Sequence, residues 1–170
     1  QRLLDRLARM RDVPSVRRED NAPRIGADHR SGGNVTPEQF SEAFGFRGVQ
    51  FGNYVEGPRR QEDLNQAYDA LMDLAGVLGI PPRALSLNGS LGLAFGARGT
   101  GGKDAAKAHF EPGKVVINLT KTKGAGSLAH EWFHAVDNHF ARKRGVNLGY
   151  VTDSTRSPRV MDGDTVRPEV

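Results

Sequence analysis

The sequence predicts an α+β fold, and three segments carry that prediction. Apolar residues recur at helical spacing between residues 61 and 79, as in an amphipathic helix that packs on a core. Residues that favour β-structure surround Pro112-Gly113, a strong turn signal, and predict a hairpin over residues 106–120. A second long helix is predicted over residues 127–143. A core helix, a small mixed or antiparallel sheet and a final helix therefore follow one another along the chain.

The composition fits one domain with a modest core. The chain has 170 residues, of which 37% are hydrophobic, and it contains no cysteine. Any metal ion would therefore be held by His, Asp or Glu, and the lack of cysteine fits a cytoplasmic protein. The net charge of +4 is explained more simply by a solvated surface than by nucleic-acid binding. No apolar run approaches the roughly 18 residues of a membrane span, so no membrane partner is expected.

The arginine-rich segment of residues 1–33 is predicted to be an arm or linker that precedes a domain over residues 34–170. Leucines at helical spacing predict a short amphipathic helix in its first dozen residues, and later prolines and glycines interrupt that pattern. The segment is either a solvated leader, which we favour, or a DNA-contacting arm whose arginines bind phosphates. Because the first residue is Gln, the chain is expected to be a fragment of a longer multidomain protein.

The first helix of the domain is predicted to be short. Thr36 suits the N-cap, Gln39 completes a capping box, and the helix is expected to end near Gly45. Aromatic residues alternate with glycines over residues 44–55, which favours an irregular segment docked on the core over a base-stacking surface. The next helix is expected to end at Gly79, ahead of two prolines.

The middle of the chain is predicted to supply the sheet. Alternation over residues 84–88 predicts one strand, and residues 91–95 predict another. The glycine-rich residues 96–104 are interpreted as a surface loop, because a phosphate-binding loop needs a helix directly after it. After the hairpin, Ser127 is expected to cap the last helix and Gly145 to end it.

The last helix contains the sequence His130-Glu131-Trp132-Phe133-His134. Residues four apart lie one helical turn above each other, so both histidines can bind one metal ion. Glu131 lies about 100° round the helix, where it can reach a water molecule on the metal but not the metal itself. Zn²⁺ lowers the pKa of such a water, and a carboxylate then removes its proton as general base.

A helical wheel predicts that this helix is buried, with one narrow polar stripe. His130, His134 and Asp137 lie on the stripe, whereas Phe133 and Phe140 lie on an apolar flank. Buried polar side chains need partners, and a metal ion would be one for the stripe. The alternative is that both histidines are ordinary buried residues with backbone partners.

The third metal ligand is open, because catalytic zinc sites use three protein ligands. Asp137 is either that ligand or a residue that orients a ligand histidine. Glu169 is the alternative ligand, since residues 167–170 resemble the first turn of a further helix. The other acidic candidates are Asp153, Asp162 and Asp164. His109 and Tyr150 are weaker candidates for groups that face the site, whereas His139 is expected to point away and His29 to be exposed.

The strand over residues 115–119, followed by the His-Glu-x-x-His helix, resembles the zincin metallopeptidases. That resemblance implies a zincin-like domain with His130 and His134 as Zn²⁺ ligands and Glu131 as general base. It also implies that the strand before the helix is a sheet edge that pairs with an extended peptide substrate. Asp137 and Phe140 stand where the extended metzincin motif has Gly and its third His. A gluzincin-like site, with a Glu from a later helix, fits better.

A second resemblance covers most of the chain, and it is to the first large polyvalent protein-associated domain. It rests on Asp28-His29-Arg30, residues 35–38, 44–49, 67–71, 80–89 and 124–132. That family occurs in multidomain proteins of phages and conjugative elements, which implies an anti-defence role in the cytoplasm. We therefore expect a zinc-dependent peptidase that acts on a protein or peptide. The alternative is a non-catalytic zincin-like module that binds nucleic acid or a protein partner.

Overall fold

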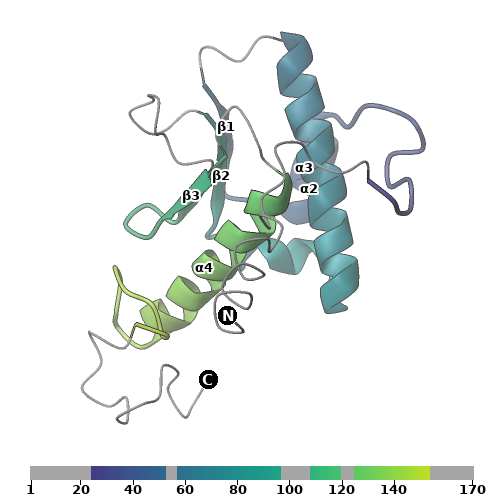
Figure 1. Ribbon diagram of the computed structural model, residues 1–170. Helices are drawn as coiled ribbons and strands as arrows, with labels where there is room; N and C mark the ends of the chain where they lie inside the picture. Colours follow the sequence, from purple (N-terminus) through teal and green to yellow (C-terminus); the bar gives the residue numbers. More distant parts are fainter. Residues whose placement is uncertain (1–23, 53–56, 97–107, 120–124, 154–170) are drawn as a thin grey trace, which may run out of the picture.

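The computed structural model describes residues 24–52, 57–96, 108–119 and 125–153, and their fold is α+β (Figure 1). In these ranges three α-helices and one short 3-10 helix accompany a four-stranded sheet. The predicted fold class is confirmed. The elements are α2 (Pro37–Phe44), β1 (Val49–Phe51), α3 (Gly57–Leu78), η1 (Pro82–Ser86), β2 (Gly92–Phe95), β3 (Ala108–Glu111), β4 (Val116–Leu119) and α4 (Ala125–Lys143).

The sheet is mixed, with the strand order β1-β2-β4-β3. β1, β2 and β4 are parallel, and β3 pairs antiparallel with β4. α3 connects the parallel strands β1 and β2, as a parallel pair requires a long crossover. β4, the strand before the last helix, lies inside the sheet and is not an edge. The prediction that β4 is the sheet edge that pairs with a peptide is therefore wrong, because β3 lies outside β4.

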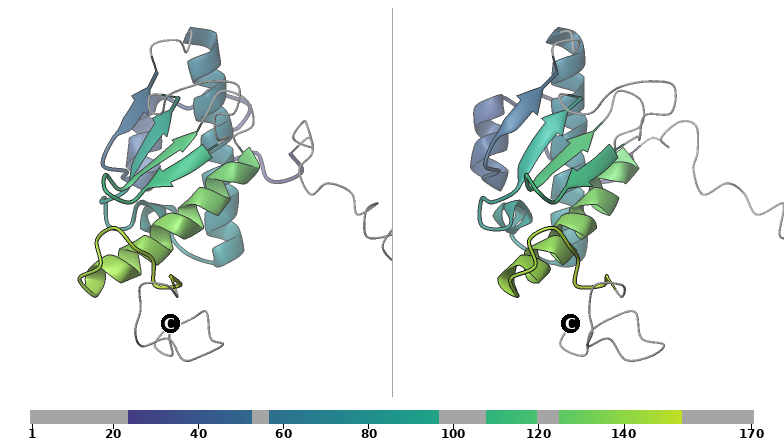
Figure 2. Two further views of the ribbon diagram at one scale, coloured as in Figure 1. Left: turned by 60° about the vertical axis from the view of Figure 1, so that its left-hand side comes forward. Right: turned by 90° about the vertical axis from the view of Figure 1, so that its left-hand side faces the viewer.

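α3 and α4 lie on the same side of the sheet, and the core lies between them and the strands (Figure 2). In the register Leu93 lies beside Ile117, which lies beside Phe110, and all three side chains belong to this core. Apolar burial of this kind is the main term that stabilises the fold. None of the helices in the described ranges has the length and apolar character needed to cross a membrane.

The predicted ends of the three helices and the predicted start of α2 are confirmed, whereas α3 begins at Gly57, before the predicted residue 61. Thr36 and Gln39 form the capping box of α2, with the Gln39 side chain accepting from the Thr36 amide at 2.9 Å. Gly45, Gly79 and Gly145 follow the three helices with φ angles of 66°, 64° and 84°, which glycine adopts without strain. α4 begins at Ala125, so Ser127 lies inside the helix and is not its cap.

The strand predicted over residues 84–88 is wrong, because this segment forms the 3-10 helix η1 and a turn. Its N1 position is a proline, whose fixed φ suits a helical start. The Ser86 hydroxyl then donates to the carbonyl of Arg83 and accepts from the amide of Gly89. Side-chain bonds to nearby backbone compete with strand pairing. Residues 44–55 also differ from the prediction, since β1 forms within them.

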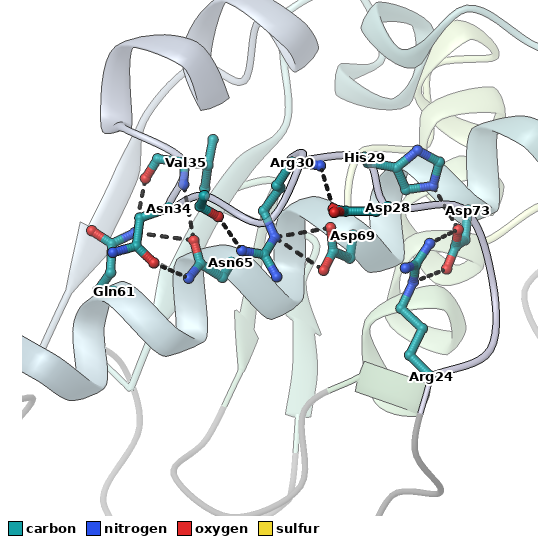
Figure 3. A network of polar contacts seen from close by, with 11 residues as sticks. Arg24, Asp28, His29, Arg30, Asn34, Val35, Gln61, Asn65, Asp69 and Asp73 are labelled. Atoms are coloured by element: carbon teal, nitrogen blue, oxygen red, sulfur yellow. Dashed lines mark hydrogen bonds and ion pairs between the residues drawn. The ribbon is translucent and has the colours of Figure 1, made fainter.

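A polar stripe on α3 binds the segment that precedes α2 (Figure 3). The stripe consists of Gln61, Asn65, Asp69 and Asp73, which are four residues apart and so lie on one face of the helix. Gln61 Nε2 donates to the carbonyl of Val35 at 2.8 Å, and Asn65 Oδ1 accepts from the backbone amide of Val35 at 3.0 Å.

The two carboxylates of the stripe bind the basic residues of this segment. Asp69 accepts from Arg30 Nε at 3.1 Å. Asp73 accepts from Arg24 Nε and Nη2 at 2.7 and 2.6 Å, and it also bonds His29 Nε2 at 2.7 Å. His29 is therefore partly buried and bonded to Asp73, contrary to the prediction that it is exposed. Residues 24–33, the described part of the predicted arm, lie against α3, whereas the helix predicted near the start of the chain lies outside the described residues.

Candidate metal centre

Two imidazole rings meet on the surface of α4, one helical turn apart. The Nε2 atoms of His130 and His134 lie 3.0 Å apart, with their ring centroids 4.6 Å apart. Two nitrogens that each lie about 2.05 Å from one tetrahedral zinc ion are separated by about 3.3 Å. The two donor atoms therefore already converge to nearly the spacing that a shared metal ion requires.

The helix is less buried than the wheel predicts. Its buried face carries Leu128, Trp132 and Ala135, as expected. The opposite flank is open, since Phe133 and Phe140 are 52% and 48% exposed, and both histidines of the pair are exposed as well. The prediction of a helix buried over most of its circumference is therefore wrong. Burial no longer argues that the histidines need a partner, and the argument for a metal rests on the spacing of their Nε2 atoms.

Glu131 lies between the buried and the exposed faces of α4, and only 9% of its surface is exposed. Tyr150 lies near it, on the turn that follows the helix. Burial raises the pKa of the Tyr150 phenol, and the charges of Glu131 and Asp137 raise it further. The Tyr150 ring also contacts His134, with ring centroids 5.8 Å apart. The histidine pair, Glu131 and Tyr150 therefore form one cluster.

Two side chains of α4 fix the helix against the rest of the fold. Trp132 Nε1 donates to the buried carbonyl of Leu85 in η1 at 2.8 Å. Arg142 Nη2 donates to the carbonyl of Pro112 at 2.6 Å, which binds the far end of α4 to the β3–β4 hairpin. The fully buried Asn138 accepts from Arg142 Nε at 3.0 Å. The Trp132 and Arg142 contacts to Leu85 and Pro112 cross between elements, so the helix has a defined rotation relative to the sheet.

The turn after α4 is held by the adjacent side chains of Asp137 and Asn138, and the role of Asn138 was not predicted from the sequence. The Asn138 amide nitrogen donates to the carbonyl of Asn147 at 3.2 Å and to that of Gly149 at 2.8 Å. Asp137 Oδ1 accepts from the amide of Val151 at 2.6 Å. The sequence signal for this role was the position of Asn138 on the same helix as the buried Ala135, because a buried amide side chain needs hydrogen-bond partners.

Asp137 also bonds the next residue of that turn. Its Oδ1 accepts from the Thr152 amide at 3.3 Å, and its Oδ2 accepts from the Thr152 hydroxyl. The carboxylate thus has three donors from the turn at residues 151–152. Asp137, which was predicted to be either the third metal ligand or a residue that orients a ligand histidine, therefore bonds the turn after α4.

The remaining candidates are not brought to the histidine pair by any described contact. His109 Nε2 lies 3.4 Å from Glu111 Oε1 on β3. The His139 ring contacts Phe140, and its pKa is lowered mainly by burial and further by the charge of Lys143. Within the described ranges, no group of three or more His, Cys, Asp or Glu side chains is arranged to hold a metal ion. Glu169, Asp162 and Asp164 lie outside the described residues.

The comparisons with known proteins bear on the N-terminal quarter of the chain. The family model of large polyvalent protein-associated domain 5 matches residues 1–43. This match supports a polyvalent-protein-associated domain. It is to domain 5, so it does not support the resemblance to domain 1, and it ends before the His-Glu-x-x-His helix. The searches of curated proteins and of solved structures gave no match.

Proposed function

We propose that this chain carries a zincin-like, zinc-dependent hydrolase site, and that the reaction is peptide hydrolysis. The observation that carries the proposal is the pair of Nε2 atoms of His130 and His134, which lie 3.0 Å apart, with the nearly buried Glu131 next to His130 in the chain. At this spacing one ring can donate a hydrogen bond to the other, and a bound zinc ion would replace that hydrogen bond. Convergent imidazoles next to a nearly buried carboxylate are what a hydrolytic zinc site requires.

The roles follow from the chemistry of the side chains. When bound, zinc supplies a Lewis acid that acidifies water and polarises a carbonyl group. His130 and His134 would hold it through Nε2, each as the neutral imidazole. Glu131 would accept the proton of the attacking water and pass it to the leaving amine.

The third ligand is proposed to be Glu169, because the described residues supply only two converging donors. A carboxylate from a segment after α4 would complete a site of two histidines and one glutamate, a set that catalytic zinc uses. Asp137, the other predicted ligand, is already bonded by the turn at residues 151–152.

The proposed substrate is an extended segment of polypeptide, and it would pair with β3. In the described part of the chain β3 is the last strand on its side of the sheet, and α4 packs against it. The outer edge of such a strand offers backbone donors and acceptors to an added strand. The peptide-pairing role that the zincin resemblance gives to a sheet edge is thus assigned to β3 in place of β4.

The proposed setting is a longer polyvalent protein of a phage or conjugative element, acting in the cytoplasm against host defences. The domain 5 match supports the polyvalent part of this proposal. The alternative, a module that binds nucleic acid through its arginines, is less favoured. Arg24 and Arg30 are engaged by Asp73 and Asp69, so these two charges are largely neutralised within the domain.

The test compares the wild-type chain with Glu131→Gln. The wild type is expected to bind one zinc ion per chain and to cleave an unfolded protein such as casein. Glu131→Gln is expected to keep the zinc and lose cleavage, because the amide cannot accept the proton. Phe133→Leu, an exposed change on the same helix, is the matched control and is expected to keep both properties. Cleavage by the zinc-loaded Glu131→Gln chain would contradict the proposal.

A further inference from the structure

The turn at residues 147–152 is held by two adjacent side chains of α4, and the residue between their contacts is Tyr150. Asn138 binds the carbonyls of Asn147 and Gly149 on one side of it. Asp137 binds the amides of Val151 and Thr152 on the other side. The backbone at Tyr150 is thus fixed before and after the residue, which fixes the point from which its side chain leaves the turn.

The direction in which Tyr150 is fixed is toward the histidine pair. Its ring lies 5.8 Å from the ring of His134, centroid to centroid, at an angle of 57° between the planes. Tyr150 is only partly exposed, so one part of the side chain packs and another remains accessible. A tyrosine combines an apolar ring that can pack with a hydroxyl that can donate a hydrogen bond to a bound group.

The same contacts decide between the two roles that the sequence left open for Asp137. An ionised carboxylate has about four lone-pair positions. Three donors from Val151 and Thr152 already approach the oxygens of Asp137, one of them on Oδ2 and two on Oδ1. A metal ion would have to displace at least part of this set and release the turn. The geometry favours a carboxylate that serves the turn.

We propose that Asp137 and Asn138 are positioning residues, and that they hold Tyr150 beside His134 so that its hydroxyl donates a hydrogen bond to the carbonyl oxygen of the bound peptide. A donor placed in advance stabilises the negative charge that develops on that oxygen during attack by water. The phenol keeps its proton throughout, so the step adds no reactant. The role of Tyr150 rests on the proposed function, whereas the positioning by Asp137 and Asn138 is independent of it.

The first arm of the test measures position in the zinc-free chain. The proton shifts of the His134 ring, measured by NMR, report the neighbouring Tyr150 ring. Tyr150→Leu is expected to move them, and Asp137→Ala to move them the same way, because the turn is released. Asp137→Asn keeps an acceptor oxygen for the Val151 amide and is expected to leave them near the wild-type values. Unchanged His134 shifts in a folded Asp137→Ala chain would overturn the positioning role.

The second arm titrates the same chains with zinc alone. Asp137→Asn is expected to bind zinc within about threefold of the wild type, because neither histidine is changed. An affinity as low as that of His134→Ala would mean that Asp137 is a ligand, which overturns the inference. Wild-type protein that binds no zinc would overturn the proposed function, and the first arm would still decide the positioning.

The third arm measures cleavage. Tyr150→Phe removes only the hydroxyl and is expected to lower kcat by about 100-fold, with zinc affinity and KM unchanged. Equal cleavage by Tyr150→Phe and wild type would overturn the donor role of the hydroxyl. A wild type that binds zinc without cleaving peptides would overturn that role together with the proposed function.

Discussion

Replacing Asp73 with Asn should destabilise the fold at neutral pH and have no effect in strong acid. The Asp73 carboxylate receives two hydrogen bonds from the Arg24 guanidinium and one contact from His29 (Figure 3). The Arg24 hydrogen bonds are the main reason that the pKa of Asp73 falls to about 2, with a smaller contribution from His29. Asn keeps the shape and one acceptor but loses the charge.

The size of the effect follows from linkage between protonation and folding. The ordinary pKa is 3.8 and the folded pKa is about 2. At about 1.36 kcal/mol for each pKa unit, this difference limits the contribution to about 2.4 kcal/mol. The Asp73 side chain is 40% exposed, so solvent screening reduces the expected value to about 1 kcal/mol. Because the folded pKa is depressed, this stability is fully present above about pH 4 and is lost as the pH falls through about 2.

Urea unfolding of both proteins between about pH 7 and pH 2 tests this prediction. The difference in free energy of unfolding should be about 1 kcal/mol at neutral pH and should close toward pH 2. Glu42→Gln, an exposed carboxylate change on α2, is the matched control and should stay within about 0.5 kcal/mol of the wild type. A difference that persists unchanged at pH 2 would refute the reasoning.

Three further predictions concern α4 and the turn after it. Trp132→Phe leaves the buried Leu85 carbonyl without its donor and should cost about 2 kcal/mol of unfolding free energy, whereas Phe133→Leu should cost less than about 0.5; equal costs would contradict the Trp132 contact. Gly145→Ala should lower the free energy of unfolding by about 1 kcal/mol, because φ is 84° at this position. Equal thermal stability of the variant and the wild type would contradict this backbone conformation. Ultraviolet titration, with Tyr150→Phe to assign the signal, should place the pKa of Tyr150 above 10, chiefly because of burial. Glu131→Gln should lower the pKa of Tyr150, because it removes a nearby negative charge. A Tyr150 pKa that is unchanged in Glu131→Gln would show that the two side chains do not interact.

Local sequence signals predicted the helices well, because their causes lie within a few residues. The capping box of Thr36 and Gln39 and the glycine after each helix are of this kind. The prediction of a strand at residues 84–88 was wrong, and its cause is also local. Alternation suggested a strand, but the fixed φ of Pro82 suits a helical start and the Ser86 side chain bonds the local backbone, so the segment forms η1.

The candidate site was predicted in part, since spacing on a helix fixes which side chains meet but not what covers them. His130 and His134 converge as the four-residue spacing requires. The wheel could not show that the Phe133 flank is open, because burial depends on which elements pack there. It also could not show that Asp137 and Asn138 bind a turn more than ten residues away.

The central claim is that His130 and His134 bind zinc together, and calorimetric titration of the whole chain with zinc tests it most directly. The account predicts one zinc ion per chain for the wild type. It also predicts loss of that site in both His130→Ala and His134→Ala, and its retention in His139→Ala, whose ring contacts Phe140. Zinc binding that survives the loss of either His130 or His134, or a wild type that binds no zinc, would contradict the account.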